Sequence, residues 1–249
     1  MFLVFKDPQA VAQFVSERLV QLIKDKPQAI LGLATGSTME PVYRRFCQDA
    51  KAQALDVSKL TSFNLDEYIG LSPEHPQSYH HYMNKHLFDH LDFAKQKTFL
   101  PDGRPDEVEA HCQQYSQKIA DYGGIDLQLL GVGGNGHIGF NEPGTAFDSR
   151  THVVELSLQT RIDNGRFFDS LDEVPTRAIT MGMKDIMEAH EILFIATGDN
   201  KAQVMADLYE SAYDEQMPAS MLKKHPNTLF IIDEKAAVKL PATACQFAA

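Results

Sequence analysis

Residues 29–38 read AILGLATGST, an apolar run that ends in small and hydroxyl-bearing residues. The same arrangement recurs in LTSFNLDEYIG (60–70), DLQLLGVGGNG (126–136) and ILFIATGDNK (192–201), and NTLFIID (227–233) is a fifth apolar run. Continuous apolar runs of this length are typical of strands that are buried on both faces of a parallel sheet. The sequence therefore predicts such a sheet, covered on both sides by helices.

The segments between these runs have helical periodicity. In residues 8–25 the apolar positions recur at helical spacing, and Pro27 ends the helix. Further helices are predicted at 39–53, 105–122, 182–190 and 201–213. This alternation predicts an α/β fold, a Rossmann-like, doubly wound and mostly parallel sheet with helices on both faces. We see no repeat, linker or low-complexity tract, so residues 1–249 are expected to form a single domain.

The composition excludes some classes of partner. The 249-residue chain has a formal net charge of -11, which argues against binding nucleic acid or an anionic membrane surface. Cys47, Cys112 and Cys245 are far apart and odd in number, so we expect neither a disulfide framework nor a CxxC metal site. Met1 is followed by no leader-like pattern, and no apolar run is long enough to span a bilayer. We therefore expect a cytoplasmic protein that does not bind membranes.

Ligands of open parallel sheets bind beyond the carboxyl ends of the strands. Four segments at these positions are polar or glycine-rich and are expected to share one cleft: ATGST, LDEYIG, GVGGNGHIGFNEPG and TGDNK. In the first of them, Thr35, Gly36, Ser37 and Thr38 precede a predicted helix that has Pro41 in its first turn. Backbone N–H groups and hydroxyls at a helix start can cradle a phosphate, although an ordinary helix cap explains the same residues equally well.

The segment GVGGNG (131–136) matches the GxGxxG pattern of dinucleotide-binding proteins. Such a site needs a helix that begins within the glycine turn, whereas Gly139, Pro143 and Gly144 oppose a sustained helix here. We therefore expect no nicotinamide cofactor.

The same loop displays Asn135, His137 and Glu142, of which the histidine can move a proton near neutral pH while the carboxylate supports it. A structural hydrogen-bonding role for His137 is the alternative. Histidines 80, 81, 86 and 90 lie on a polar helical stretch and are expected on a solvated face, and no metal-ligand spacing is present.

Asp66 and Glu67 are adjacent carboxylates at the end of a predicted strand. Successive strand residues point in opposite directions, so at most one of the two readily faces the cleft. That carboxylate is a candidate base, and a cap or loop acceptor is the equal alternative. Lys201 and Arg166 are candidate anion-binding cations, although a single cation is more often a solvated surface charge.

Taken together, several segments resemble the glucosamine-6-phosphate deaminase family (glucosamine/galactosamine-6-phosphate isomerases): ATGST, FNLDEYIG, GNGHIGFNEPG, SRTHVVEL, DNGRFF, ATGDNKA and PASMLKKHP. The resemblance covers nearly the whole chain in order. It implies conversion of glucosamine 6-phosphate to fructose 6-phosphate and ammonia, with no metal or nucleotide cofactor. It also implies that Asp66 moves the proton between C2 and C1 and that His137, supported by Glu142, opens the sugar ring. It places the phosphate on Thr35, Gly36, Ser37, Thr38, Arg166 and Lys201.

Two departures from the family pattern are visible. Well-known members have Asp at the position of Asn135, and an amide can orient the histidine but cannot stabilise an imidazolium by charge. Allosterically activated hexamers have basic residues where this chain has His152 and Val154, and a C-terminal tyrosine that it lacks. We therefore expect activity with Asn135, no allosteric activation, and either a monomer or a small homo-oligomer.

Three other functions remain as alternatives. The orientation of the C4 hydroxyl does not follow from sequence, so a galactosamine 6-phosphate substrate is open. The 6-phosphogluconolactonases typically have DER and GHTASLFP where this chain has DEY and GHIGFNEP, and a sugar-phosphate-sensing repressor would add a helix-turn-helix segment. The weakly periodic region 152–178 is expected to be irregular and to close over the ligand as a lid, and a long surface connection without such a role is the alternative.

Overall fold

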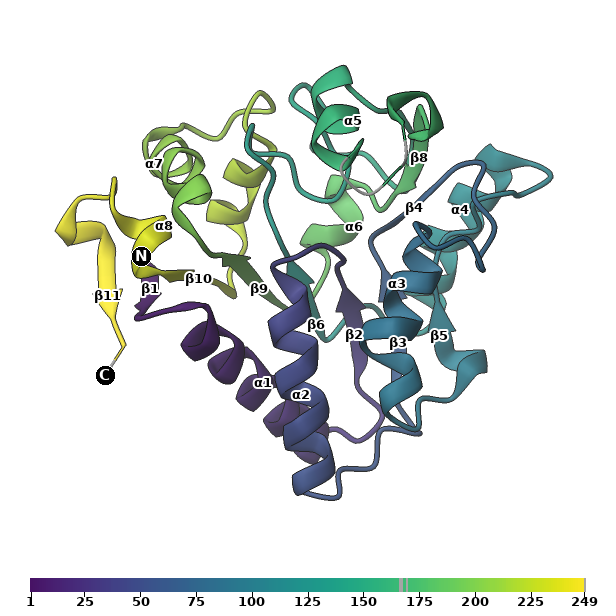
Figure 1. The fold of residues 1–249 in the computed structure, drawn as a ribbon, viewed down its shortest axis with the longest axis horizontal. Helices are drawn as coiled ribbons and strands as arrows, with labels where there is room; N and C mark the ends of the chain where they lie inside the picture. Colours follow the sequence, from purple (N-terminus) through teal and green to yellow (C-terminus); the bar gives the residue numbers. More distant parts are fainter. Residues whose placement is uncertain (166–167, 169, 249) are drawn as a thin grey trace.

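The computed structural model describes residues 1–165, 168 and 170–248, and it contains an eight-stranded sheet in which every neighbouring pair is parallel (Figure 1). The strands in spatial order are β11 (Cys245–Phe247), β1 (Phe2–Phe5), β10 (Thr228–Asp233), β9 (Glu191–Ala196), β6 (Leu127–Leu130), β2 (Ile30–Leu33), β3 (Thr61–Asn64) and β5 (Thr98–Phe99). The parallel α/β fold predicted from the apolar runs is confirmed.

The centre of the sheet is apolar because its strands are covered on both faces. Leu129 on β6 pairs with Leu193 on β9, and both side chains are fully buried, as is Phe194. Full burial of such side chains stabilises the fold by about 2 kcal/mol each. This explains why the strand sequences are continuously apolar rather than alternating.

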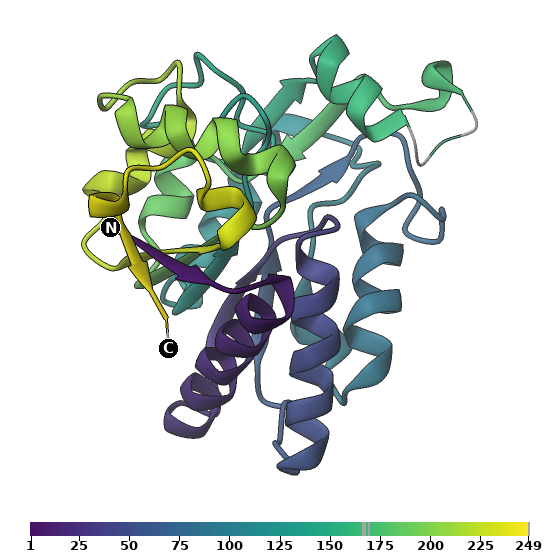
Figure 2. The same ribbon diagram turned by 60° about the vertical axis from the view of Figure 1, so that its left-hand side comes forward.

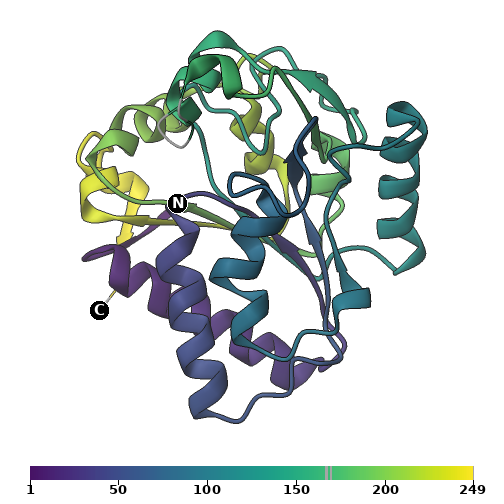
Figure 3. The same cartoon turned by 45° about the vertical axis from the view of Figure 1, so that its right-hand side comes forward.

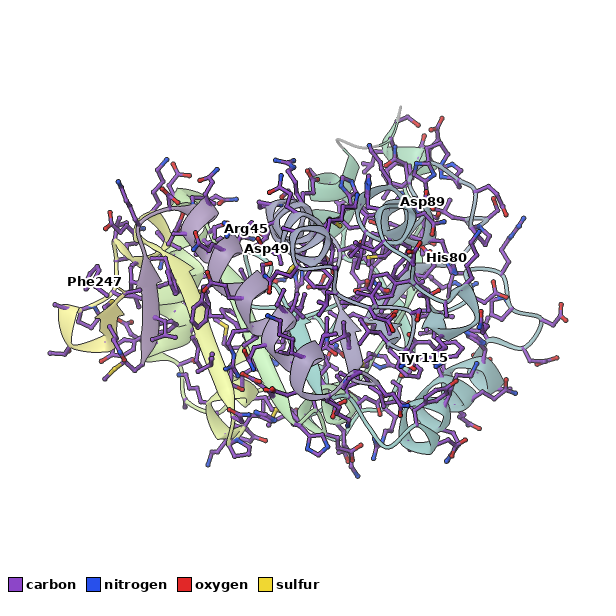
Figure 4. The ribbon with its side chains drawn as sticks, turned by 90° about the horizontal axis from the view of Figure 1, so that it is seen from below. Arg45, Asp49, His80, Asp89, Tyr115 and Phe247 are labelled. Atoms are coloured by element: carbon purple, nitrogen blue, oxygen red, sulfur yellow. The ribbon has the colours of Figure 1, made fainter. Side chains whose placement is uncertain are left out.

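Helices cover both faces of this sheet (Figures 1 and 3), with α1, α2 and α3 on one face and α4 on the other. On α2, Asp49 accepts a hydrogen bond from Ser16 Oγ on α1 at 2.7 Å and pairs with Arg45 Nε at 2.8 Å, so it joins the two helices (Figure 4). The α-helices are α1 (Pro8–Asp25), α2 (Met39–Ala52), α3 (Tyr79–His86), α4 (Val108–Asp121), α5 (Leu158–Gly165), α6 (Met183–Met187), α7 (Ala202–Glu210) and α8 (Glu234–Ala237). The 3-10 helices are η1 (Phe88–His90), η2 (Lys95–Lys97), η3 (Leu171–Glu173), η4 (Asp199–Lys201), η5 (Pro218–Lys224) and η6 (Ala242–Ala244).

A second, antiparallel sheet lies with α5 above the carboxyl ends of the large sheet (Figures 1 and 2). Its strands in order are β4 (Asp66–Tyr68), β8 (Arg177–Thr180) and β7 (His152–Glu155). Two expectations are therefore wrong. The strand predicted to end at Asp66 and Glu67 ends at Asn64 instead, and Asp66 begins a strand of the second sheet. The segment 152–178 is not irregular throughout, because β7, α5 and the start of β8 lie within it.

The connectivity places a crevice between β2 and β6. From β2 the chain moves outward through β3 to β5, whereas from β6 it moves the other way through β9 to β10. The loops that follow β2 and β6 therefore diverge at a topological switch point, where ligands of doubly wound sheets bind. Across the residues that the structure describes, no helix has both the length and the apolarity needed to cross a bilayer.

Candidate active site

A cavity of about 560 Å³ opens at this switch point. Most of the residues predicted from the sequence line it together: Thr35, Gly36, Ser37, Thr38, Asp66, His137 and Lys201. Asn135 and Glu142 are hydrogen-bonded to one another behind the histidine, and Arg166 lies outside the described residues. The convergence of Asp66 and His137 on one space is thus observed.

Asp66 is the first residue of β4, where it pairs with Thr180 of β8. Its side chain faces the cavity, yet the residue is only 6% exposed. Burial, and to a lesser extent the neighbouring charge of Glu67, raise the pKa of this carboxyl from 3.8 to about 8. A carboxyl with a pKa near neutrality is well suited to accept and return a proton.

Glu67 points the other way, as alternation along a strand requires, and is 1% exposed. Its carboxylate accepts hydrogen bonds from the backbone N–H of Tyr68 at 2.9 Å and of Tyr79 and His80 at 3.0 Å. The His80 ring Nδ1 is also 2.9 Å from it. Glu67 therefore anchors β4 to the first turn of α3, and of the two adjacent carboxylates only Asp66 is placed for chemistry.

The α3 histidines are less exposed than predicted. His80 contacts buried Glu67, whereas His81 and His86 line the cavity, so a solvated face is the wrong description for these three. Burial lowers the pKa of His86. His90, on η1, is exposed as expected. The α3 face toward α2 and the cavity could not be recognised because its polar residues show no apolar periodicity.

His137 is held in a tight turn after β6. A Cβ at Gly133 would lie 2.0 Å from the His137 ring, and Gly136 has a φ of +86°, so the turn requires glycine at both positions. No helix begins anywhere in the fully described loop 131–151. The GxGxxG match is therefore not a dinucleotide turn, as the sequence indicated.

The histidine begins a chain of hydrogen bonds. Its Nδ1 is 2.7 Å from Asn135 Oδ1, and Asn135 Nδ2 donates to Glu142 Oε2 at 2.7 Å. Because a carboxylate only accepts, the amide must present Nδ2 to Glu142 and Oδ1 to the ring, which fixes the proton on Nδ1. Exchange of a proton with a ligand must then use Nε2. Glu142 Oε2 lies 3.8 Å from Nδ1, close enough to stabilise an imidazolium.

The chain of hydrogen bonds continues into α5, which sequence reasoning missed. Thr160 Oγ1 donates to Glu142 Oε1, and Ser157 Oγ donates to Thr160 Oγ1 at 2.9 Å. Thr160 also lines the cavity. The only sequence signal was Ser157 three residues ahead of it, in the position of a helix N-cap, and that pattern says nothing of a partner eighteen residues earlier.

The loop 35–38 also lines the cavity. Gly36 has a φ of +100°, and its carbonyl accepts from Tyr82 OH at 2.8 Å and from Met39 N at 3.0 Å. Within the described part of the chain, the Thr38 side chain makes no capping hydrogen bond to α2. The simple cap interpretation therefore loses its main support, and the hydroxyls remain beside an N-terminus that favours anions.

Lys201, at the end of η4, brings a cation to the cavity. Its Nζ donates to the carbonyl oxygen of Val132 at 2.7 Å, which holds the side chain across the loop after β6.

Aromatic residues Tyr68, Phe140 and Phe168 complete the wall near Asp66. Among the described residues, no group of three or more His, Cys, Asp or Glu side chains could hold a metal ion.

Comparison with known proteins gives a consistent result. The model of the glucosamine-6-phosphate isomerase/6-phosphogluconolactonase family matches residues 7–231. A glucosamine-6-phosphate deaminase of Geobacillus sp. (strain WCH70) is 48% identical over 233 residues, which cover 94% of this chain and 93% of that protein. A glucosamine-6-phosphate deaminase of Bacillus velezensis (strain DSM 23117 / BGSC 10A6 / LMG 26770 / FZB42) is 51% identical over 219 residues, covering 88% and 91%.

A solved structure agrees with the sequence matches. It is described as a monomeric glucosamine-6-phosphate deaminase and superimposes with a TM-score of 0.94 at 43% identity. The superposition covers 96% of this chain and 100% of the other.

Proposed function

The chain belongs to the family of glucosamine-6-phosphate isomerases and 6-phosphogluconolactonases, and we propose that it is a glucosamine-6-phosphate deaminase. It converts glucosamine 6-phosphate to fructose 6-phosphate and ammonia. The observation that carries the proposal is the cavity in which Asp66 and His137 face one space, with the loop 35–38 and Lys201 beside them.

The phosphate binds at the end of the cavity formed by loop 35–38. The N-terminus of α2, the hydroxyls of this loop and the Lys201 ammonium supply donors and positive charge in a protein whose net charge is -11. Arg166 adds a second cation in this proposal. Binding energy at this remote group orients the reacting carbons without taking part in the chemistry.

His137 opens the pyranose ring by exchanging a proton through Nε2 with the ring oxygen. Asn135 keeps the proton on Nδ1, and Glu142 supplies the negative charge that favours the imidazolium form. The neutral amide positions the ring, and the carboxylate one step behind it supplies the charge.

Asp66 takes the proton from C2 of the open-chain sugar and returns it at C1, which converts the amino aldose into a 2-imino sugar. Water then adds to C2 and the C–N bond breaks, which releases ammonia and leaves the ketose. In the free protein its raised pKa, about 8, keeps it partly protonated at neutral pH. The cationic amine of the substrate favours the ionised carboxylate once it is bound. The value of kcat/KM should therefore rise with pH and level off above about pH 8, because the free enzyme must lose this proton to act as a base.

A direct assay tests the proposal against its alternatives. Purified protein is given glucosamine 6-phosphate, galactosamine 6-phosphate or 6-phosphogluconolactone, and ammonia, ketose phosphate and lactone hydrolysis are measured. We expect ammonia and fructose 6-phosphate from the first compound only. Asp66→Asn should abolish turnover while Asp89→Asn, an exposed control, retains it (Figure 4). Absence of ammonia release from both amino sugars would refute the proposal, whereas lactone hydrolysis or phosphate-ligand binding alone would favour the lactonase or the sensor.

Several broader properties belong to the same proposal. The protein works without metal or nucleotide cofactor, as a single domain spanning 1–249, in the cytoplasm, and as a monomer or small homo-oligomer. The segment 152–178 closes over the sugar as a lid, supported by Thr160 and Phe168 in the cavity wall. Bound substrate analogue should then reduce proteolytic cleavage within this segment, and unchanged cleavage would argue against a lid.

A further inference from the structure

Glu142 is held from two sides, by the amide of Asn135 and by the hydroxyl of Thr160. Its Oε2 accepts from Asn135 Nδ2 at 2.7 Å, and its Oε1 accepts from the hydroxyl of Thr160, in the first turn of α5. Thr160 is 5% exposed, lines the cavity and comes from a different segment of the chain than Asn135. The carboxylate that supports His137 is thus clamped between the loop after β6 and the segment 152–178.

The direction of the hydrogen bonds in this clamp is fixed by the helix start. Ser157 Oγ accepts from the backbone N–H of Thr160 at 3.1 Å, and it donates its own proton to Thr160 Oγ1 at 2.9 Å. Thr160 must then direct its hydroxyl proton at Glu142, because an ionised carboxylate offers only acceptors. The hydroxyl of Thr160 has one orientation, and it is the one that binds Glu142.

We propose that Thr160 is a positioning residue for the acid/base step at the sugar ring, acting through Glu142 and Asn135 on His137. The proposal rests on the deaminase function proposed above. With Thr160 in place, both carboxylate oxygens are fixed, so Asn135 is held with Oδ1 toward the ring and Nε2 of His137 is aimed at the substrate. Without it, the carboxylate rotates and the ring loses its orientation. Because Thr160 lies on α5, this alignment exists only when that helix is seated over the cavity.

Thr160→Val tests this inference with little change of side-chain volume. We expect kcat to fall about 10- to 100-fold, the effect of losing one hydrogen bond to a charged group. Thr160→Ser, which keeps the hydroxyl, should retain kcat within about 3-fold of wild type, since only a methyl group is removed. Thr176→Val, an exposed threonine in the same segment, is the matched control and should behave as wild type. Thermal unfolding of each variant shows whether it folds.

Two further measurements separate positioning from a merely structural or ligand-binding role. In a Glu142→Ala background, Thr160→Val should cause no additional fall in residual kcat, because residues that act through one another are not additive. Binding of an open-chain amino-hexitol 6-phosphate, which needs no ring opening, should be unchanged by Thr160→Val within about 3-fold.

The inference is overturned if Thr160→Val keeps wild-type kcat, if Thr160→Ser fails to rescue, or if Thr160→Val lowers kcat equally with and without Glu142. Its failure is distinct from failure of the proposed function. A wild-type protein that releases no ammonia refutes the function itself, whereas an active wild type with an equally active Thr160→Val variant refutes only the role of Thr160.

Discussion

Replacement of Asp66 by Asn should abolish activity and at the same time stabilise the fold at alkaline pH. The carboxyl is buried beside the carboxylate of Glu67, and burial raises its pKa from 3.8 to about 8. Between these two pH values the folded protein keeps a proton that the unfolded chain has already released. The free energy of unfolding therefore falls as pH rises from about 4 to about 8, because over this range the folded protein binds one more proton than the unfolded chain.

The magnitude follows from the two pKa values. Each unit between them corresponds to about 1.4 kcal/mol, so Asp66 lowers the free energy of unfolding by about 2 kcal/mol at pH 5 and about 6 kcal/mol at pH 9. An amide of the same shape does not titrate. The free energy of unfolding of Asp66→Asn, relative to wild type, should accordingly improve by about 4 kcal/mol between pH 5 and pH 9.

Guanidinium unfolding at pH 5, 6, 7, 8 and 9 measures this difference. Asp89→Asn serves as the control, since Asp89 is exposed and its removal should leave a stability profile parallel to wild type. Parallel profiles for Asp66→Asn and wild type would show that Asp66 ionises normally in the folded protein, and the argument for a buried base of raised pKa would then be refuted.

Three other predictions concern phosphate binding, the role of Asn135 and allosteric regulation. Lys201→Met should raise KM for glucosamine 6-phosphate about 10-fold or more with a smaller change in kcat, because Lys201 is proposed to bind the phosphate and not to take part in the chemistry. Lys239→Met, at an exposed lysine that is hydrogen-bonded to Gln203, is the control and should leave KM unchanged. Asn135→Asp should give no gain in kcat, and a gain of 10-fold or more would show that the amide limits catalysis. Saturation curves should be hyperbolic with or without N-acetylglucosamine 6-phosphate, and sigmoidal kinetics relieved by that compound would contradict the expectation drawn from His152 and Val154.

The large sheet could be predicted because its signals are local and strong. The helix predicted over 8–25 is α1 (Pro8–Asp25), and the apolar run at 192–197 is β9 (Glu191–Ala196). The second sheet could not be predicted for the opposite reason. Its strands read DEY (β4), HVVE (β7) and RAIT (β8), so charged residues take the place of a continuous apolar run, and their pairing partners are far apart in the chain.

Part of the candidate site could likewise be predicted from the sequence and part could not. Asp66, His137 and the loop 35–38 were predicted because each follows a recognisable strand, and parallel strands end at one edge. The roles of Glu67 and Thr160 could not be predicted, because they depend on contacts between segments that are far apart in the sequence. The sequence does not distinguish Glu67 from Asp66, and the structure separates them because backbone N–H groups of α3 bind Glu67. Thr160 lies in no sequence motif that indicates its contact with Glu142.

The position of Asn135 shows why the residue that departs from the family pattern fits this chain. Its Nδ2 lies 2.7 Å from Glu142 Oε2, with the amide hydrogen between them. A carboxylate in its place would bring two oxygens to that distance with no proton between them, and like charges at such a distance repel strongly. Either a proton would have to be taken up or the two groups would separate, and separation would turn Glu142 away from His137. In this arrangement the neutral amide of Asn135 orients the histidine through its hydrogen bond, and the single negative charge lies on Glu142, 3.8 Å from Nδ1 of the ring.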